Sequence, residues 1–383
     1  MITKVAISGY RSLRDIVLPL GQLTVVTGAN GTGKSSIYRS LRLLADIADD
    51  RIISSIAREG GFSSVRWAGP ETVSRGMRDG SVKLQGTVRK GPVALKLGFA
   101  DDAMSYSIEL GLPTPVPGTL FGSDPEIKRE VIWMGEKPTP RQIIADRRGP
   151  SIQVRNDQHE KVQYRTDLAG YDSMIRHTVG PDAPWEFSDL RSRLAAWRFY
   201  DHFRTDQDAP ARKAQIGTRT PALAPSGSDL AAAIRTIYEI GDGDALDEAI
   251  NTAFPGASLE VNVEAGLFQL NMRQHGMLRP LGASELSDGT LRFILLAAAL
   301  LTPRPAPLIV LNEPEASLHS SLIPALAHLI IRASEDAQIV TVSHNRTLVS
   351  SLLGADAELV ELYKETGETF IEGDRVSWNW PAR

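Results

Sequence analysis

The sequence predicts an α/β fold with a mostly parallel sheet, and two features of the chain lead to this prediction. A short apolar, β-branched run at residues 23–27 leads directly into a glycine-rich loop, and residues 35–44 then show helical spacing of apolar side chains. From residue 288 onwards, helical segments alternate with apolar strand-like segments, which is typical of a parallel sheet covered by helices. Ligands of such sheets bind at the carboxyl ends of the strands, so a site is expected there.

The glycine-rich loop, Gly-Ala-Asn-Gly-Thr-Gly-Lys-Ser at residues 28–35, matches the phosphate-loop (P-loop) pattern G-x-x-x-x-G-K-[ST] at every position. Its glycines allow backbone N–H groups to converge on phosphate oxygens, and the helix that follows adds the positive end of its dipole. Lys34 is expected to reach the β- and γ-phosphates, and Ser35 to ligate Mg²⁺. A glycine turn without a ligand is the alternative, which the flanking strand and helix disfavour. The residues expected to bind the nucleotide here are Gly28, Ala29, Asn30, Gly31, Thr32, Gly33, Lys34, Ser35 and Ser36.

Composition sets the broad class of protein. The chain has 383 residues, enough for two or three domains, and its 42% hydrophobic and 23% charged content is ordinary for a globular protein with a buried core. The net charge of −4 gives no overall positive field that would attract nucleic acid. Binding to DNA would therefore require a local patch of basic side chains. The absence of cysteine rules out disulfides, thiolate catalysis and cysteine-based zinc sites.

No segment predicts a membrane span or an export signal. The longest apolar stretch, residues 293–301, is too short to cross a bilayer. The N-terminus begins like a strand and lacks the features of a signal peptide. We therefore expect a cytoplasmic protein without a membrane partner.

The first two thirds of the chain are expected to form strands and then helices. Period-two alternation, with turns at Gly91-Pro92 and Asp101-Asp102, predicts an antiparallel meander after the first helix. Residues 185–203 show a helical pattern, and residues 204–226 form a long polar connection of a kind that is usually functional or mobile. Strands are expected at residues 3–8, 15–20, 23–27, 82–88, 93–97, 104–110, 130–134, 151–155 and 161–165.

The last third begins with helices at residues 230–240 and 245–254 and a hairpin about Ala265-Gly266. The hairpin strands are expected at residues 258–264 and 267–273. We divide the chain into an N-terminal lobe with the P-loop, a central insertion of strands and then helices, and an α/β C-terminal lobe. The boundaries of these three parts are expected at residues 1–110, 111–227 and 228–383.

An apolar strand at residues 308–311 ends in Asn312-Glu313, the position of the polar pair called Walker B. Glu313 is the natural candidate to orient and polarise an attacking water. The first member is usually Asp, which helps to hold Mg²⁺. The amide of Asn312 keeps an oxygen ligand but loses the charge, so we expect modest magnesium affinity or turnover. A strand that simply ends in a turn at Pro314 is the alternative for this segment alone.

The segment Leu286-Ser-Asp-Gly-Thr290 opens a long apolar helix and resembles the L-S-G-G-Q signature of ABC-type ATPases, with Asp288 and Thr290 as departures. Ser287, Asp288 and Gly289, with the N–H groups that open the helix, are expected to contact a γ-phosphate. In ABC-type ATPases, the signature of one subunit closes on the ATP of the other. An ordinary capped helix start is the alternative for these residues.

Two more elements continue the resemblance. Residues 338–344 form a strand that ends in His344, in the place of the switch histidine that senses the γ-phosphate. His319 follows Glu313 where ABC-type proteins carry a loop that contacts the partner subunit. One element is missing, because no glutamine lies between Lys34 and Gln85 to serve as the glutamine-containing loop of ABC-type proteins.

Taken together, the chain resembles the ABC-type AAA-family ATPases of the RecF/SMC/OLD group, and above all bacterial predicted ATPases related to the OLD ATPase domain. The resemblance spans nearly the whole chain. It is carried by Gly9-Tyr-Arg-Ser-Leu-Arg14, Trp197-Arg-Phe-Tyr-Asp-His-Phe-Arg-Thr205, Gly217-Thr-Arg-Thr-Pro221, Leu286-Ser-Asp-Gly-Thr-Leu-Arg292 and Leu311-Asn-Glu-Pro-Glu-Ala-Ser-Leu-His319. Asn312 is common in that set, so it does not imply an inactive enzyme.

The resemblance implies an ABC-type ATPase head that binds ATP and Mg²⁺ and hydrolyses ATP slowly, with Glu313 and His344 as catalytic residues. It favours a homodimer that closes on ATP and controls a separate effector, such as an anti-phage nuclease. Two alternatives remain: a RecF-like repair ATPase that binds DNA, and a scaffold that binds ATP without hydrolysing it. The effector, the trigger and the counterpart of the glutamine loop are not identified by the sequence.

Overall fold

The computed structural model describes residues 1–78, 81–83, 86, 94–156, 158, 160–180, 183–374 and 376–382. The chain divides into two compact units, each of which combines segments far apart in the sequence. The first unit comprises Met1–Gly21, Gly28–Trp197 and Val360–Arg383, and the second comprises Gln22–Thr27 and Arg198–Leu359. Residues 111–197 fall in the first unit and residues 198–227 in the second, and the three-part division of the chain stays a prediction.

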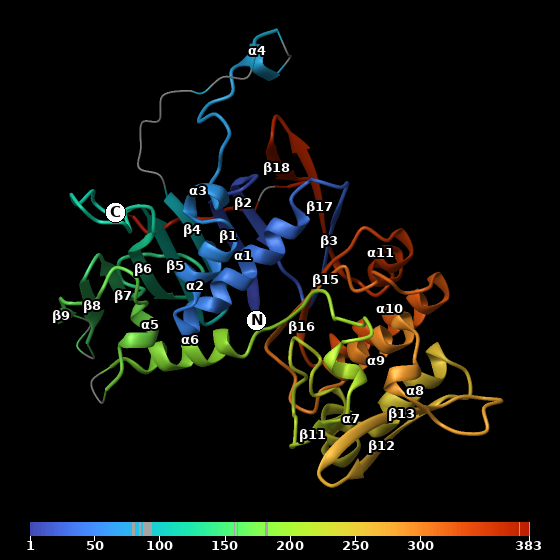
Figure 1. Cartoon of the computed structure of the whole chain (residues 1–383). Helices are drawn as coiled ribbons and strands as arrows, with labels where there is room; N and C mark the ends of the chain where they lie inside the picture. The colour runs from blue at the N-terminus through green and yellow to red at the C-terminus, as the bar shows by residue number, and fades with distance from the viewer. Residues whose placement is uncertain are drawn as a thin grey trace. The chain divides into compact units, whose positions relative to one another are not determined.

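The first unit is built on an eight-stranded sheet in the order β2-β1-β4-β5-β6-β7-β8-β9 (Figure 1). Every pairing in it is antiparallel, as expected for a meander. The strands are β1 (Ile2–Tyr10), β2 (Leu13–Pro19), β4 (Ala94–Asp101), β5 (Met104–Gly111), β6 (Glu126–Met134), β7 (Ile143–Arg148), β8 (Ser151–Arg155) and β9 (Lys161–Arg165). All but β7 correspond to a predicted strand.

Helix α1 (Lys34–Asp46) packs against β1 and β4 through the apolar face that its spacing predicts, with Ile37, Leu41 and Leu44 buried. It is the helix that follows the P-loop, so its packing fixes the direction in which the loop's N–H groups point. The other helices of this unit are η1 (Ile47–Asp49), α2 (Ile52–Arg58), α3 (Phe62–Val65), α4 (Arg75–Arg78), α5 (Met174–His177) and α6 (Trp185–Ala195).

A buried ion pair holds the middle of the eight-stranded sheet. Arg147 Nη1 lies 2.8 Å from Glu130 Oε2, and both side chains are fully buried. Glu130 also accepts hydrogen bonds from Tyr106 Oη at 2.7 Å and from Ser173 Oγ at 2.6 Å. Burial and the adjacent carboxylate raise the pKa of Tyr106, so its hydroxyl remains a donor. A buried carboxylate needs such partners, and here they connect β5, β6 and β7 to α5.

The second unit contains a parallel sheet in the order β10-β15-β16-β3, formed by Arg198–Tyr200, Leu308–Asn312, Gln338–Val342 and Leu23–Gly28. The pairings β10–β15, β15–β16 and β16–β3 are all parallel, which confirms the predicted sheet type. Asn312 pairs with Val342, and Val342 pairs with Val26. The carboxyl ends of these strands are therefore level, and the chain leaves β3 for the P-loop at this same edge.

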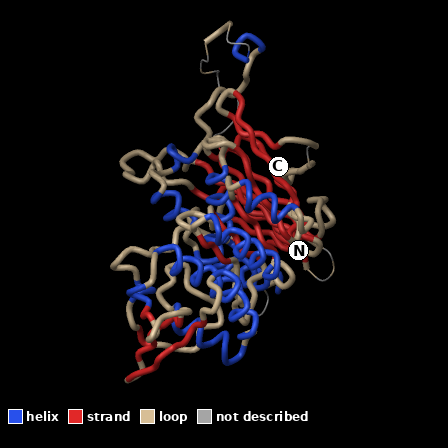
Figure 2. The backbone as a smooth tube through the Cα atoms, turned by 90° about the vertical axis from the view of Figure 1, so that its right-hand side faces the viewer, coloured by secondary structure: helices blue, strands red, loops and turns tan. Residues whose placement is uncertain are grey.

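Helices and a small antiparallel sheet complete the second unit, which is the more helical of the two (Figure 2). The helix α9 (Asp288–Leu300) is buried along nearly its whole length and forms the centre of the core. The other helices are α7 (Leu230–Ile240), α8 (Gly243–Ala253), α10 (Ile323–Ala333), α11 (Arg346–Leu353), η2 (Pro210–Arg212), η3 (Ala283–Glu285) and η4 (Ser320–Leu322). The small sheet consists of β11 (Gln215–Ile216), β12 (Ser258–Glu264), β13 (Leu267–Arg273) and β14 (Leu281–Gly282).

Two predictions about secondary structure differ from the structure or fall on residues that it does not describe. The helix predicted at residues 185–203 ends at Ala195. The chain then forms β10, because residues 198–200 pair in parallel with the edge of β15 that β16 does not occupy. Most of the strand predicted at residues 82–88, including Gln85, lies outside the described residues; its described residues 82, 83 and 86 are not in a strand.

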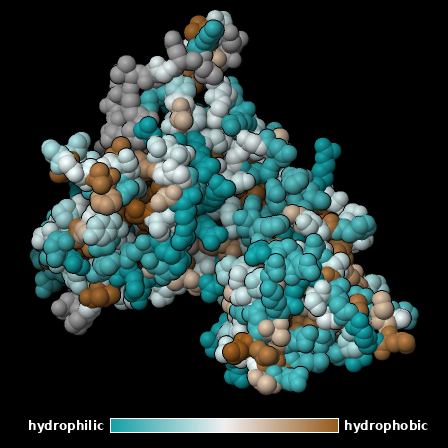
Figure 3. Space-filling model, viewed as in Figure 1, coloured by the Kyte–Doolittle hydropathy of each residue, from teal (hydrophilic) through white to brown (hydrophobic). Residues whose placement is uncertain are grey.

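The surface is mostly polar on the face shown in Figure 3, with apolar side chains in small groups. One group lies near the β12–β13 turn, where Ile216, Val263 and Leu267 are exposed. Among the described helices, none combines the length and the apolar character needed to cross a membrane.

Candidate functional site

The P-loop begins at the end of β3 and continues into α1 in the first unit. Gly33 has a φ of 110°, and a Cβ there would lie 2.6 Å from Thr369 Oγ1. Gly28 has a φ of 144°, and a Cβ there would lie 2.4 Å from Leu362 O. Both positions therefore require glycine. Gly33 is the N-cap of α1 and has no side chain, so no capping side chain covers the helix N-terminus, which is the end that favours an anion.

The ammonium of Lys34 lies inside this loop. Its Nζ donates to Gly28 O at 2.7 Å and to Ala29 O at 3.0 Å, and the residue is only 6% exposed. Thr32 Oγ1 donates to Ala29 O at 2.8 Å and closes the turn. The buried ammonium of Lys34 is thus hydrogen-bonded to the backbone of the P-loop. It is expected to contact the phosphate groups that this loop binds.

A strand from the end of the chain supports the P-loop. β18 (Glu368–Ile371) pairs with β17 (Glu358–Glu365), and Thr369 of β18 is buried. The Thr369 hydroxyl donates to Thr32 O at 2.7 Å and lies 2.8 Å from Ser12 Oγ, while Thr369 N donates to Ser12 O at 2.9 Å. The β1–β2 turn and β18 therefore fix the loop from one side. Sequence reasoning gave Thr369 no role.

At the end of β15, Glu313 has a left-handed backbone with a φ of 47°. Such a conformation costs free energy in a residue with a Cβ and is typical of functional sites. It is held from both sides: Glu313 N donates to Val342 O at 2.8 Å, and Arg292 Nη2 donates to Glu313 O at 3.2 Å. The carboxylate of Glu313 is partly exposed, as a group that must reach water should be.

His344 lies next to this carboxylate, two residues after the end of β16 at Val342, and so beyond the strand that was predicted to end in it. Its Nδ1 is 3.5 Å from Glu313 Oε1 and 3.9 Å from Glu315 Oε1. Glu315 is buried and accepts a hydrogen bond of 2.6 Å from Ser343 Oγ. The two residues predicted to be catalytic, Glu313 and His344, are therefore brought together, and the buried Glu315 holds the backbone beside them.

Asn312 contacts a carboxylate from the neighbouring strand. Its Nδ2 donates to Asp201 Oδ1 at 2.8 Å, because the parallel register of Tyr200 with Leu311 places the residue after β10 beside the last residue of β15. Asn312 Oδ1 is buried and has no hydrogen-bond partner within the described part of the chain. The amide therefore offers one oxygen that no described group occupies.

The buried Arg292 of α9 connects the ends of β10 and β15. Its Nη2 donates to Glu313 O at 3.2 Å and to Asp201 O at 3.4 Å, and its Nη1 lies 3.2 Å from His202 Nδ1. Burial lowers the pKa of this guanidinium, while the carboxylates of Asp201, Glu315 and Glu313 oppose that shift. An arginine remains charged under these conditions, so the site carries a fixed internal cation.

The signature residues begin α9, and their surroundings fit a capped but accessible helix start. Ser287 is the N-cap, and its Oγ accepts a hydrogen bond of 3.2 Å from Thr290 N. Arg212 donates to Asp288 Oδ1 and to Leu286 O, each at 2.7 Å, and so orients the segment. Ser287 and Asp288 are exposed, and Gly289 is half-buried. This geometry agrees with both the signature and the alternative of an ordinary cap.

The predicted residues fall into three groups. The P-loop residues 28–36 lie together in the first unit, Asn312, Glu313 and His344 lie together in the second, and residues 287–289 begin α9 in that second unit.

A family model described as "AAA domain, putative AbiEii toxin, Type IV TA system" matches residues 23–350, which includes every predicted site residue. The chain belongs to this family of AAA domains. The AAA domain is of the ABC type found in the RecF/SMC/OLD group, as the resemblance implied.

Solved structures agree on the fold. An SMC head crystallised with the C-terminal winged-helix domain of ScpA aligns with a TM-score of 0.57 and 13% identity, over 98% of each chain. An SMC head from Pyrococcus furiosus, bound to the C-terminal domain of ScpA, gives a TM-score of 0.52 and 13% identity, over 97% of this chain and 95% of that one. At such identity the likeness shows the fold alone.

A short segment matches a curated relative. It is 43% identical over 44 residues to an OLD nuclease of Thermus scotoductus, and it covers 12% of this chain and 8% of the relative. The match thus involves only a small part of the nuclease.

The AAA domain has residues that fit a magnesium ion. Ser35 lies in the P-loop, and the orphaned oxygen of Asn312 is the kind of neutral oxygen ligand that Mg²⁺ accepts. Within the described ranges, no group of three or more His, Asp or Glu side chains is arranged to hold a metal by itself. Mg²⁺ that is bound through phosphates needs only one or two protein oxygens, so either residue by itself is a suitable ligand for such an ion.

Besides Thr369, sequence reasoning missed four residues of the second unit's site: Asp201, His202, Arg292 and Glu315. All four lie in segments that carry the family resemblance, namely residues 197–205, 286–292 and 311–319. The resemblance therefore identified the segments that contain these residues. A single sequence does not show which side chains of those segments contact one another.

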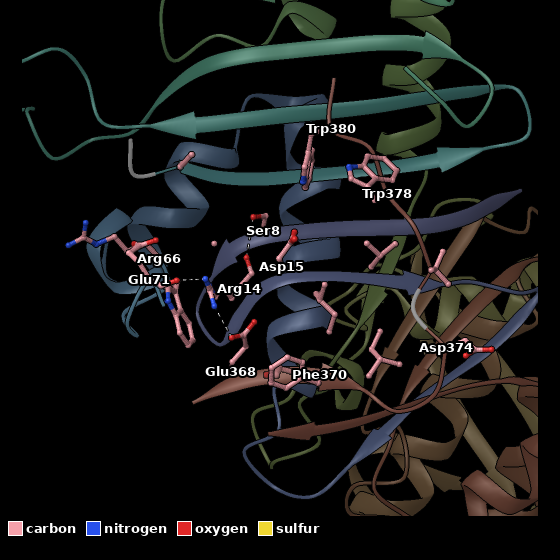
Figure 4. Close-up of a pocket in the computed structure, with 18 residues that line it drawn as sticks. Ser8, Arg14, Asp15, Arg66, Glu71, Glu368, Phe370, Asp374, Trp378 and Trp380 are labelled. Atoms are coloured by element: carbon pink, nitrogen blue, oxygen red, sulfur yellow. Dashed lines mark hydrogen bonds and ion pairs between the residues drawn. The ribbon is translucent and has the colours of Figure 1, made fainter. Parts of the chain in front are cut away.

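A cavity of about 650 Å³ lies in the first unit, partly between β2 and β18 (Figure 4). Arg14 lies at this cavity, where it contacts the carboxylate of Glu368 at 3.2 Å and the carbonyl of Glu71. The rings of Trp378 and Trp380 meet edge to face, with centroids 5.4 Å apart. No predicted nucleotide-binding residue is among those that line it, but Thr369, which donates to Thr32 O of the P-loop, is.

Proposed function

We propose that this AAA domain binds ATP with Mg²⁺ and hydrolyses it, and that the change of nucleotide acts as a switch. The observation that carries the proposal is the meeting of Glu313 and His344, 3.5 Å apart at the end of β15. This is the same sheet edge at which the chain leaves β3 for the P-loop.

In this proposal, the P-loop N–H groups and Lys34 bind the phosphates. Glu313 orients a water, whose oxygen bonds to the γ-phosphorus while the bond to the β,γ-bridging oxygen breaks and ADP leaves. The proton of the water passes to Glu313 and then to the released phosphate. His344 contacts the γ-phosphate and so distinguishes ATP from ADP. Bound Mg²⁺ would neutralise phosphate charge, with Ser35 and Asn312 as the residues that hold it.

We infer further that two copies close on ATP. The observation in support is the exposure of Ser287 and Asp288 at the start of α9, which makes them accessible to a nucleotide held by another copy. In such a dimer, the signature of one protomer would face the ATP bound at Lys34 of its partner. The dimer would form with ATP and open after hydrolysis.

The switch is proposed to control a separate effector, such as a nuclease, in defence against phage. Two comparisons support this choice: the family description names a putative toxin of a type IV toxin–antitoxin system, and the matched curated relative is a nuclease.

Phosphate release with ATP and Mg²⁺ tests the proposal. The intact protein should release phosphate, and Glu313→Gln should bind ATP but release it at least about a hundredfold more slowly, the scale of losing a general base. The Asp208→Asn variant, which changes an exposed carboxylate beyond the site, serves as the matched control and should match the intact rate. Equal rates for the intact protein and Glu313→Gln would refute the assigned role. Tight ATP binding without turnover would indicate a scaffold, and turnover that rises with DNA would indicate a RecF-like enzyme.

A further inference from the structure

The end of β10 supplies a carboxylate beside the unusual amide of Asn312. Asp201 directly follows β10, and its Oδ1 accepts the hydrogen bond of 2.8 Å from Asn312 Nδ2. The two residues are 111 positions apart in the sequence, and the parallel pairing of Tyr200 with Leu311 brings them together.

This hydrogen bond fixes the orientation of the Asn312 amide. An ionised carboxylate can only accept, so the Asn312 atom that faces Asp201 is the nitrogen, and the oxygen must point elsewhere. That oxygen is the buried Oδ1 that lacks a partner among the described residues. Asp201 therefore determines that Asn312 presents an oxygen, which is the atom that a hard cation binds.

The carboxylate of Asp201 attracts the nearby guanidinium of Arg292 but forms no direct ion pair with it. Among the described residues, no ion pair involves its carboxylate. The nearby cation, Arg292, directs its hydrogen bonds at the backbone oxygens of Asp201 and Glu313 and at the ring of His202. Asp201 is exposed, so its negative charge acts at the edge of the sheet where the nucleotide is proposed to bind.

We propose that Asp201 and Asn312 together replace the single acidic residue usual at this strand end. Asn312 provides the oxygen, and Asp201 provides the negative charge and holds the amide in its orientation. Asp201 is thus a positioning residue for the Mg²⁺ of bound MgATP. The inference rests on the proposed ATP binding.

The Asp201→Asn variant separates charge from geometry. An asparagine at 201 keeps an oxygen that accepts from Asn312 Nδ2, and it removes only the charge. We expect the Mg²⁺ concentration needed for half-maximal nucleotide binding to rise by about tenfold, the effect of losing one partly solvated charge contact. Nucleotide binding measured in EDTA, without Mg²⁺, should not change. Asp208→Asn, in the same segment but outside the site, should bind like the intact protein.

The exchanged pair, Asp201→Asn with Asn312→Asp, provides the second test. It keeps one amide and one carboxylate in contact and should bring the Mg²⁺ requirement back to within about threefold of the intact protein. A purely structural hydrogen bond predicts a different pattern, in which neither variant shifts the Mg²⁺ requirement, because both variants keep a hydrogen bond between the two side chains.

Titration of Mg²⁺ against a fluorescent ATP analogue, with melting curves in parallel, measures all these effects. An unchanged Mg²⁺ requirement in folded Asp201→Asn would overturn this inference and leave the proposed function intact. If the intact protein bound no nucleotide at any Mg²⁺ concentration, the proposed function would fail first and this inference with it.

Discussion

Glu313 combines a catalytic assignment with a left-handed backbone, and the two can be tested separately. The conformation costs a residue with a Cβ roughly 1–2 kcal/mol, and glycine avoids this cost. The hydrogen bonds to Val342 O and from Arg292 hold the backbone there in spite of the cost.

We predict that Glu313→Gly is more stable than Glu313→Ala by about 1 kcal/mol, although both lose ATP turnover. Since both variants lack the carboxylate, the difference isolates the backbone term. Urea denaturation of the two variants gives the comparison. Equal stability, or a less stable glycine variant, would show that the left-handed conformation is not strained.

Lys34 is the second residue whose contacts make a direct prediction. Its ammonium is the buried cation of the P-loop, so Lys34→Ala should weaken ATP binding by at least about a hundredfold while leaving the fold intact. Isothermal titration measures the affinity, and Lys213→Ala, which changes an exposed lysine of the second unit, is the control. Unchanged affinity in Lys34→Ala would refute the P-loop assignment.

At the scale of elements, the sequence predicts best where the signal is local. The hairpin of β12 and β13 has the predicted bounds, because Ala265-Gly266 adopts positive φ values between two alternating runs. The strands at the start of the chain and the alternation after residue 288 are confirmed for the same reason.

Elements whose stability comes from distant partners were missed. β10 has three residues and exists because β15 offers it a parallel neighbour, so no local pattern distinguishes it from the end of α6. The strand β7 contains three consecutive charged residues, Asp146, Arg147 and Arg148, so its sequence does not alternate between apolar and polar residues. Asp146 and Arg147 are nevertheless buried, because they form ion pairs with Arg129 and Glu130 of the neighbouring strand β6. The contact of Asp201 with Asn312 follows from β10 and was missed with it.

Helix α9 links the signature to the strand end through Arg292, and this link gives a prediction at the element scale. Arg292→Met would leave the carbonyls of Glu313 and Asp201 without their donor, so we expect a loss of about 2 kcal/mol in unfolding free energy. ATP turnover should fall more than ATP affinity, because Glu313 loses its support while the P-loop is untouched.

Urea denaturation, phosphate release and isothermal titration measure the three quantities for Arg292→Met. The matched control is Arg332→Met, which removes a partly exposed arginine that pairs with Asp242 and Glu248. If turnover and affinity fell in equal proportion, Arg292 would be a stability residue only.

At the scale of the whole molecule, the proposed chemistry is divided between the two units. The P-loop residues belong to the first unit, and the strand-end and signature residues belong to the second. Sequence motifs predict which residues form these groups, but they do not show how two copies assemble.

The proposed dimer predicts complementation between defective copies. Lys34→Ala and Ser287→Arg should each be inactive alone, since one lacks the phosphate cation and the other has a blocked signature. A mixed dimer contains one composite site with both defects and one with neither, so mixing should raise phosphate release above that of either variant. Activity that stays at the sum of the separate variants would contradict composite sites, unless both sites must act together.

The most direct test of the switch is therefore the molar mass of Glu313→Gln with and without ATP and Mg²⁺, measured by light scattering. This variant should bind ATP without consuming it, so the closed form should accumulate. The account predicts that the mass doubles with ATP and returns to that of the monomer with ADP. A mass that stays that of the monomer at every protein and ATP concentration, while ATP binding is demonstrated, would contradict a nucleotide switch that acts by dimerisation.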